Sequence, residues 1–294
     1  MKCGCIDIGT NTTRVLVARA HDGALTDVRE QRAYTRIGEG LELGASIPRA
    51  RIEATAAVVA AQRELAERLG ASSVRTVATA VVRRAANRDE FCAALRRAGG
   101  VEVCVLDGAE EARLAFLGAT RTLGRPLAGR VGVVDVGGGS TELAVGTLAG
   151  GVEWAASFEL GSGTLADRHL RADPPTPAQL RALRADAALA LAGAAPPPVA
   201  TAVAVGGSAA SLRRLVGPVL DGLALERALR TLLSAPAATL AERLAIDVRR
   251  VRLLPAGLLA LDAAARLLGQ PLLIGRGGLR EGVVLDLAGS FTTR

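Results

Sequence analysis

Asp7-Ile8-Gly9-Thr10-Asn11-Thr12-Thr13-Arg14-Val15-Leu16-Val17 is the stretch that decides the fold, because its pattern occurs twice in the chain. It aligns without a gap on Asp135-Val136-Gly137-Gly138-Gly139-Ser140-Thr141-Glu142-Leu143-Ala144-Val145, at an offset of 135 − 7 = 128 residues. In both copies an apolar strand ends at an Asp, a turn of small residues follows, and a second apolar run begins. This internal repeat predicts two similar units in one chain.

Both turns have the composition of a phosphate-binding loop. Glycine lets the backbone approach an anion closely and aim N–H groups at it, and Ser or Thr hydroxyls add donors. The residues predicted to bind phosphate are Gly9, Thr10, Asn11, Thr12, Thr13 and Arg14, then Gly137, Gly138, Gly139, Ser140 and Thr141. Gly207 and Ser208, between a predicted strand and helix, form a further candidate at a helix N-terminus. An ordinary β-turn with a solvated Asp is the alternative for either copy alone.

The Asp that precedes each turn is expected to have a role other than phosphate binding. A carboxylate repels phosphate, so Asp7 and Asp135 are better placed to hold a bridging cation or to position water. Two other phosphate-binding patterns do not fit. The GxxxxGK[ST] loop requires a lysine, and Lys2 is the only lysine in the chain. In the GxGxxG pattern the glycines lead into a helix, whereas here a strand is predicted to follow.

Alternating apolar strands and helices along the chain predict α/β layers. The predicted strands are Lys2–Ile8, Arg14–Ala20, Val74–Ala78, Val101–Leu106, Val131–Val136, Thr141–Thr147, Val152–Leu160, Val199–Val205 and Pro271–Ile274. The predicted helices are Pro48–Leu69, Arg88–Ala98, Glu110–Ala119, Thr176–Ala194, Pro255–Leu268 and Leu279–Leu287, with one more after Gly206-Gly207-Ser208. The break at Leu123-Gly124-Arg125-Pro126 predicts domains at 1–123 and 124–294, and the last helix is a candidate to pack on the first domain.

The composition narrows the class of partner. The net charge of +7 suits a polyanion, although a bias toward arginine in an Ala- and Gly-rich chain is an alternative cause. The four cysteines form no CxxC pair and there are two histidines, so a zinc site is not expected. Cys3 and Cys5 lie two apart in a predicted strand and are expected to be buried on one face. With neither a signal peptide nor a membrane span predicted, the expected location is the cytoplasm.

Five segments in the same order resemble motifs of the exopolyphosphatase / guanosine pentaphosphate phosphohydrolase (Ppx/GppA) family, in its short two-domain form. They are Asp7–Arg14 (against D-I-G-S-N-S-x-R, with Thr for both Ser), Ala78–Asn87 (A-T-x-x-x-R-x-A-x-N), Gly108–Leu114 (G-x-x-E-A-x-L), Asp135–Leu143 (D-[IV]-G-G-G-S-T-E-L) and Gly278–Gly282 (G-L-R-E-G). Paired Asp-Gly phosphate hairpins are also similar to those of the wider superfamily of actin, the sugar kinases and the heat-shock chaperone ATPases. In one departure, Asp107 stands where the family often has Ser.

The resemblance implies two actin-like (ribonuclease H-like) α/β domains with mixed sheets flanked by helices and an active cleft between them. It implies that Glu111 is the catalytic carboxylate that activates water and that Arg83 contacts the phosphate chain or the transferring phosphoryl group. It also implies that Asp135 and Glu142 bind a divalent metal, with Mg²⁺ the expected cofactor. Glu110, next to Glu111, stays a possible substitute for it.

The function is therefore expected to be metal-dependent hydrolysis of terminal phosphate from inorganic polyphosphate. Guanosine pentaphosphate hydrolysis is the first alternative, and a non-catalytic sensor of polyphosphate or guanosine phosphates is the second. A sugar-kinase-like ATPase would need an adenosine pocket and an acceptor site, for which the sequence offers no candidate. No nucleic-acid or membrane partner is expected, and the family resemblance implies a homodimer.

Overall fold

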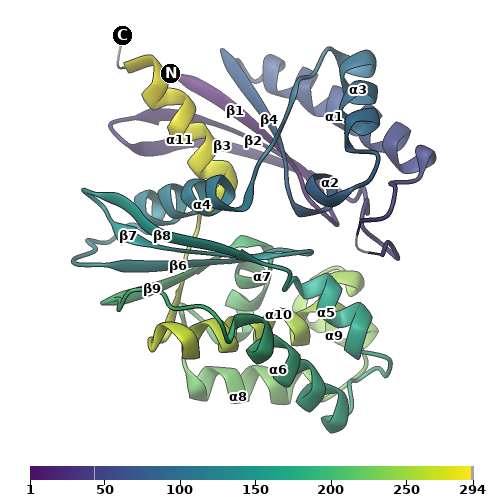
Figure 1. Cartoon of the computed structure of the whole chain (residues 1–294), viewed down its shortest axis with the longest axis vertical. Coiled ribbons are helices and arrows are strands. Elements are labelled where there is room, and N and C mark those ends of the chain that lie inside the picture. Colours follow the sequence, from purple (N-terminus) through teal and green to yellow (C-terminus); the bar gives the residue numbers. More distant parts are fainter. Residues whose placement is uncertain (43, 293–294) are drawn as a thin grey trace. The chain divides into compact units, whose positions relative to one another are not determined.

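The computed structural model describes residues 1–42 and 44–292, with the side chains of residues 290–292 left out. The chain divides into two compact units. The first unit combines Met1–Thr122 with the C-terminal helix that starts at Leu279, and the second is Leu123–Gly278. The helix α11 (Leu279–Thr292) lies along α4 (Gly108–Thr122) in the first unit (Figure 1). The chain therefore contributes to the first unit from both of its ends.

The first unit is built on a five-stranded mixed sheet in the order β3-β2-β1-β4-β5. Its strands are β1 (Lys2–Ile8), β2 (Thr13–His21), β3 (Ala24–Ala33), β4 (Ser73–Ala78) and β5 (Val103–Val105). The helices α1 (Arg49–Arg68), α2 (Ala80–Arg84), α3 (Arg88–Gly99), α4 and α11 complete it. Alternation along β1 sends Cys3 and Cys5 into a core shared with α4 and α11, and Ile6 and Ile8 into a core shared with α1 and α3.

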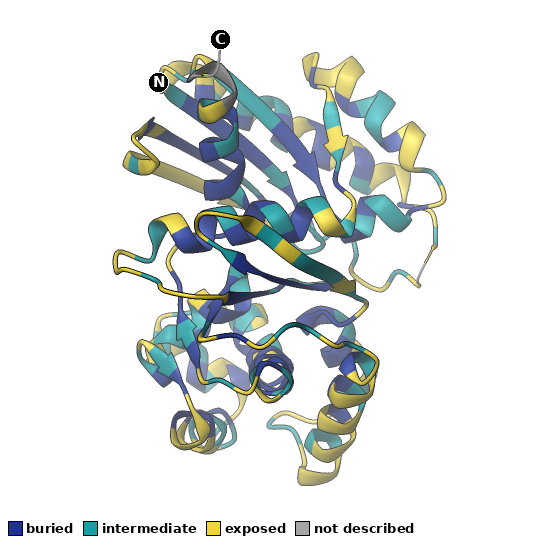
Figure 2. Cartoon of the chain, turned by 60° about the vertical axis from the view of Figure 1, so that its left-hand side comes forward, coloured by how far each residue is buried: buried dark blue, intermediate teal, exposed yellow. Residues whose placement is uncertain are grey.

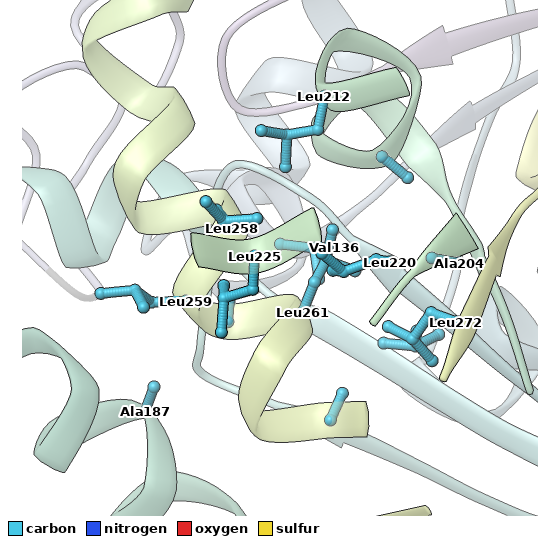
Figure 3. Close-up of a cluster of buried hydrophobic side chains, with 14 of the residues drawn as sticks. Val136, Ala187, Ala204, Leu212, Leu220, Leu225, Leu258, Leu259, Leu261 and Leu272 are labelled. Carbon is cyan, nitrogen blue, oxygen red and sulfur yellow. The ribbon is translucent and has the colours of Figure 1, made fainter. Parts of the chain in front are cut away.

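The second unit repeats this topology. Its six-stranded sheet has the order β10-β11-β9-β6-β7-β8, so β8-β7-β6-β9-β11 corresponds to β3-β2-β1-β4-β5. The strands are β6 (Val131–Val136), β7 (Thr141–Thr147), β8 (Gly151–Phe158), β9 (Thr201–Val205), β10 (Val219–Leu220) and β11 (Leu272–Ile274). The helices are α5 (Ser162–His169), α6 (Pro177–Leu191), α7 (Gly206–Val216), α8 (Gly222–Leu232), α9 (Ala237–Leu244) and α10 (Val248–Leu268). Leu258, Leu259 and Leu261 of α10 pack in the core with strand residues such as Val136 (Figure 3). The predicted fold, mixed sheets flanked by helices, is confirmed.

Several elements differ from the sequence predictions. The strand β3 was not predicted, because most of its residues are exposed and its sequence lacks an alternating apolar pattern (Figure 2). Helix α10 begins at Val248, seven residues before the predicted start at Pro255, so this proline lies inside the helix rather than in its first turn. Helices α2, α5, α8 and α9 were also missed. Among the residues that the structure describes, every helix is too short or too polar to cross a membrane.

Candidate active site

The two repeated stretches form the same hairpin in their separate units. In the first, the Gly9 N–H donates to the Thr12 carbonyl at 3.0 Å, and in the second the Gly137 N–H donates to the Ser140 carbonyl at 2.9 Å. Strand register places Asp7 opposite Arg14 across the first hairpin, and Asp135 opposite Glu142 across the second. We call residues 9–12 the first loop and residues 137–140 the second loop.

The first loop is bonded to the connector between β3 and α1. The Arg36 N–H donates to the Asn11 carbonyl at 3.1 Å, and the Gly38 N–H donates to the Thr10 carbonyl at 3.0 Å. A side chain on Gly38 would collide with Cγ2 of Thr10, so the close approach requires glycine. In a planar trans peptide the C=O and the following N–H point in opposite directions. The N–H groups of Asn11 and Thr12 therefore point away from the connector.

The second loop is held in the same way by the start of α5. The Ser162 N–H donates to the Gly137 carbonyl at 2.9 Å, and the Gly163 N–H donates to the Gly138 carbonyl at 2.9 Å. A side chain on Gly161 would collide with the backbone of Gly138. The N–H groups of Gly138 and Gly139 consequently point away from α5. Each unit thus presents backbone donors on the side of its loop that faces away from the segment behind it, as an anion site requires.

Two threonines predicted to bind phosphate have a different position. Thr13 and Thr141 are both fully buried. The hydroxyl of Thr13 shares a 2.9 Å hydrogen bond with the hydroxyl of Thr35, and the hydroxyl of Thr141 donates to the Leu160 carbonyl. These bonds tie each hairpin to the segment that follows the third strand of its unit. This placement argues against direct phosphate contact by either hydroxyl and gives both residues an anchoring role.

Ser208 is also placed inside its unit. Helix α7 begins at Gly206, so Gly207 and Ser208 belong to its first turn rather than to a loop before it. Ser208 is buried, and a Cβ on Gly257 would lie 2.9 Å from its Oγ. The side chain therefore faces α10. Any anion binding at this helix end would depend on backbone N–H groups and not on the Ser208 hydroxyl.

Asp135 and Glu142 form a pair of carboxylates at the second hairpin. They are direct cross-strand neighbours, so their side chains share one face of the sheet. Glu142 is buried and accepts a 2.8 Å hydrogen bond from the Ser157 hydroxyl. The Asp135 carboxylate lies against the start of α7, where a side chain on Gly206 would collide with it. The positive end of the helix dipole stabilises a carboxylate there.

This pair fits a divalent cation. Like charges directly opposite each other on two strands repel, and a cation between them would remove the repulsion. Within the described residues, no group of three or more His, Cys, Asp or Glu side chains is arranged to hold a metal ion. One or two carboxylates completed by water and substrate oxygens form the usual environment of Mg²⁺. Asp135 and Glu142 match that environment.

Asp7 occupies the equivalent position in the first unit, but its surroundings differ. Its cross-strand neighbour is Arg14, and Arg280 and Glu281 of α11 also act on its charge. Burial raises the pKa of Asp7, while Arg280 and Arg14 oppose that shift without cancelling it. Arg280 and Arg14 both favour the charged form of this carboxylate, so its electrostatic surroundings differ from those of Asp135, which faces Glu142 across its hairpin. The metal-ligand role of Asp7 stays a prediction.

Glu111 and Arg83 form an ion pair in the first unit. Glu111 lies in the first turn of α4 and is 6% exposed. Nη1 of Arg83 donates to Oε2 of Glu111 at 2.8 Å and to the Leu106 carbonyl at 2.8 Å. The sequence predicted both residues but not their contact. The carboxylate is thereby held in a fixed orientation at the start of the helix.

Glu110 has a different environment from Glu111. Both of its carboxylate oxygens accept hydrogen bonds from Arg113, at 2.7 and 2.8 Å. Its backbone N–H donates to Oδ1 of Asp107 at 2.8 Å. Asp107, which stands where the family often has Ser, therefore caps the N-terminus of α4. Glu110 is thus a half-exposed partner of Arg113, whereas Glu111 is the buried carboxylate.

Sequence reasoning missed the glycines and connectors that hold the loops. Gly38 and Gly161 lie far from their loops in the sequence and give no motif of their own. The available signal was the repeated G-x-G spacing at Gly38–Gly40 and Gly161–Gly163, each of which follows the third strand of its unit.

The duplicated topology and the two loops define a class of protein: an α/β chain with the actin-like fold that carries the same glycine-containing hairpin in each unit. The chain belongs to the Ppx/GppA phosphatase family, which matches residues 16–291. The predicted family is thereby confirmed, and the enzyme class is that of a phosphatase.

Three relatives show the extent of the similarity. Exopolyphosphatase 1 of Mycobacterium leprae is 32% identical over 97% of this chain and 89% of its own length. An uncharacterized Streptomyces coelicolor protein is 37% identical over 63% of this chain, and the alignment spans only 55% of that protein. The crystal structure of the Aquifex aeolicus member of the Ppx/GppA family is 28% identical, covers 99% of this chain and 98% of that one, and superposes with a TM-score of 0.83.

Proposed function

We propose that this phosphatase is an exopolyphosphatase, which releases terminal phosphate from inorganic polyphosphate. The observation that carries the proposal is the duplicated loop, because two sets of outward-pointing backbone N–H groups suit a substrate with several phosphates. The mycobacterial relative that matches nearly the whole chain is itself named an exopolyphosphatase. A net charge of +7 agrees with a polyanionic substrate.

In this proposal Glu111 is the general base. It accepts a proton from the water that attacks the terminal phosphorus, while the phosphoanhydride bond breaks and the shortened chain leaves. Arg83 orients the carboxylate through their 2.8 Å contact, and its guanidinium, 20% exposed, is also proposed to contact the phosphate chain. The N–H groups of the two loops stabilise charge on the phosphate oxygens.

Asp135 and Glu142 are proposed to hold a divalent cation, with Mg²⁺ the expected ion. When bound, such an ion would neutralise charge on phosphate oxygens. The protein's own contribution is the fixed position of the two carboxylates, set by the β6–β7 register, the Ser157 hydroxyl and the absence of a side chain on Gly206.

Hydrolysis of guanosine pentaphosphate is the second candidate function. Tyr34 favours it, because this aromatic side chain is 42% exposed and directly precedes Thr35, which is bonded to the first hairpin. An exposed aromatic ring can stack on a base. A non-catalytic sensor is the remaining alternative. Cytoplasmic location and homodimerisation stay predictions from the sequence and the resemblance.

The test is phosphate release in the presence of Mg²⁺ from polyphosphates of several lengths, guanosine pentaphosphate and ATP. We expect release from polyphosphate and a loss of about 10³-fold in Glu111→Gln, since removal of a general base has an effect of that order. Release from guanosine pentaphosphate alone would select the second function. The absence of release from every substrate would favour the sensor.

Glu110→Gln is the matched control, because it changes the same residue type one position earlier on α4. Its activity should stay within about twofold of the wild type, as for most half-exposed substitutions. If Glu110→Gln lost as much activity as Glu111→Gln, the assignment of the base would be wrong.

A further inference from the structure

Arg36 has an unusual backbone conformation. Four described residues other than glycine have a positive φ: Asp22 at 49°, Asp27 at 52°, Arg36 at 47° and Ala245 at 50°. Asp tolerates this region because its short side chain bonds locally, and Ala245 follows the end of α9, where left-handed residues are common. Arg36 has a long side chain and does not follow the end of a helix, so neither explanation applies to it. A non-glycine residue there is strained.

The surrounding structure forces Arg36 into this conformation. Its neighbours Thr35 and Ile37 are both buried, and its own N–H is bonded to Asn11 of the first loop. Arg51 of α1 donates to the carbonyls of Ile37 at 3.2 Å and Glu39 at 2.6 Å. The backbone is therefore fixed on both sides, and a glycine at position 36 would relieve the strain without losing any of these contacts.

A residue that destabilises the fold and could be replaced by glycine must contribute through its side chain. The Arg36 side chain is 36% exposed, and its contact with Glu39 is a long one at 3.8 Å. An exposed pair of this kind adds little stability. The guanidinium can therefore exchange Glu39 for another anion at low cost.

The two units supply positive charge behind their loops in different ways. Behind the second loop stands the N-terminus of α5, whose dipole carries partial positive charge. Behind the first loop, residues 34–42 form neither helix nor strand, and Arg36 is the charged one of the two residues bonded to the loop. Backbones joined in this manner lie about 4.8 Å apart, which is shorter than an extended arginine side chain. The guanidinium of Arg36 can thus pass the edge of the first loop and reach an anion on its outer side.

We propose that Arg36 is a further substrate-binding residue, whose guanidinium binds a phosphate of the substrate at the first loop. This inference rests on the proposed function, because the ligand is the phosphate chain that the loop is proposed to hold. Arginine suits the position because its planar fork can donate two hydrogen bonds to one phosphate. The left-handed backbone is retained because no glycine can supply that charge.

Arg36→Gly separates binding from stability. We expect its melting temperature to equal or exceed that of the wild type, its KM for polyphosphate to rise about tenfold and its kcat to change little. Arg36→Lys should recover part of the loss in KM, since it restores the charge without the fork. Ala245→Gly is the matched control, because it relieves the same backbone conformation at a distance in sequence from either loop, and its KM should be unchanged.

Binding of inorganic tripolyphosphate, measured by calorimetry, tests Arg36 independently of hydrolysis. If the wild type binds tripolyphosphate but releases no phosphate, the proposed function fails, and tenfold weaker binding by Arg36→Gly would still support this inference. An unchanged KM and affinity in Arg36→Gly would overturn it. A lower melting temperature with an unchanged affinity would overturn it as well, because Arg36 would then be structural.

Discussion

The two hairpins have the same backbone hydrogen bond and differ in the charge of their side chains. Each closes with the same hydrogen bond, from Gly9 to Thr12 in one and from Gly137 to Ser140 in the other. Opposite the Asp of the first hairpin stands Arg14, while opposite the Asp of the second stands Glu142. Across the strands of its own hairpin, the first Asp faces a cationic side chain and the second faces another carboxylate. One duplicated hairpin thus carries an Asp–Arg pair in the first unit and an Asp–Glu pair in the second, and we propose different roles for the two pairs.

The largest expected effect compares the two Asp residues. Asp135→Asn should reduce phosphate release by about 10²-fold or more and raise the Mg²⁺ concentration needed for half-maximal rate, because it removes one of two proposed ligands. Asp7→Asn should leave the Mg²⁺ requirement unchanged, since Arg280 and Arg14 already favour the charged form of that carboxylate. The measurement is the rate as a function of Mg²⁺ concentration. Equal shifts in both variants would contradict the division of roles between the hairpins.

A smaller effect compares the glycines behind the loops. Gly161→Ala would press a methyl group on the backbone of the second loop and should destabilise the protein by about 2–3 kcal/mol, with loss of activity. The nearest atoms to the new methyl group in Gly38→Ala are side-chain atoms of Thr10 and Val81, which can shift more easily than backbone, so its cost should be about 1–2 kcal/mol.

The double variant Gly38→Ala with Thr10→Ser should recover most of the Gly38→Ala loss, because Ser lacks the methyl group that collides. Chemical denaturation measures all three variants, and Gly193→Ala, where a Cβ would meet open space, is the control. The absence of any recovery in the double variant would show that the first loop tolerates no side chain at position 38 for another reason.

The smallest effect concerns the acid stability of the first unit. Asp286 of α11 accepts hydrogen bonds from Arg75 at 2.8 Å and from Arg113 at 2.9 Å. Burial by itself would raise the pKa of Asp286, but these two hydrogen bonds outweigh it and hold the pKa below 3.8, its ordinary value. A lowered pKa contributes stability that is present above the unfolded value and is lost as the pH falls through the folded value.

Wild-type stability should therefore decline below about pH 4 in part through Asp286. Asp286→Asn should be less stable at pH 7 by about 1–2 kcal/mol and should lack this part of the acid decline. Melting curves between pH 3 and pH 7 measure both the stability at pH 7 and its decline in acid. In the second unit, Asp186 also has a lowered pKa through His169 and Arg168, so Asp186→Asn is the matched variant. An acid decline identical in wild type and Asp286→Asn would contradict the role of Asp286.

The sequence by itself determined much of the fold and the candidate site. The gapless repeat of Asp7–Val17 at Asp135–Val145 predicted two similar hairpins, because loop residues and strand alternation are local properties that a linear pattern preserves. The resemblance of five ordered motifs to the Ppx/GppA family pointed to Glu111 and Arg83. Local pattern reasoning missed β3, because that strand is mostly exposed and lacks the apolar alternation typical of strands. It also misplaced the start of α10, because Pro255 lies inside this helix rather than at its first turn.

Only the tertiary structure decided the surroundings of the predicted side chains. Thr13 and Thr141 were grouped with the phosphate donors, yet both hydroxyls are bonded inside their units, because each hairpin needs an anchor to the segment after the third strand. Glu110 and Glu111 are adjacent acidic residues, and the tertiary structure separates them because Arg83 of α2 is bonded to Glu111 of α4. The strain at Arg36 arises from partners at Asn11 and Arg51. Such contacts join residues that are distant along the chain, and they exist only once the sheet and helices have brought those residues together.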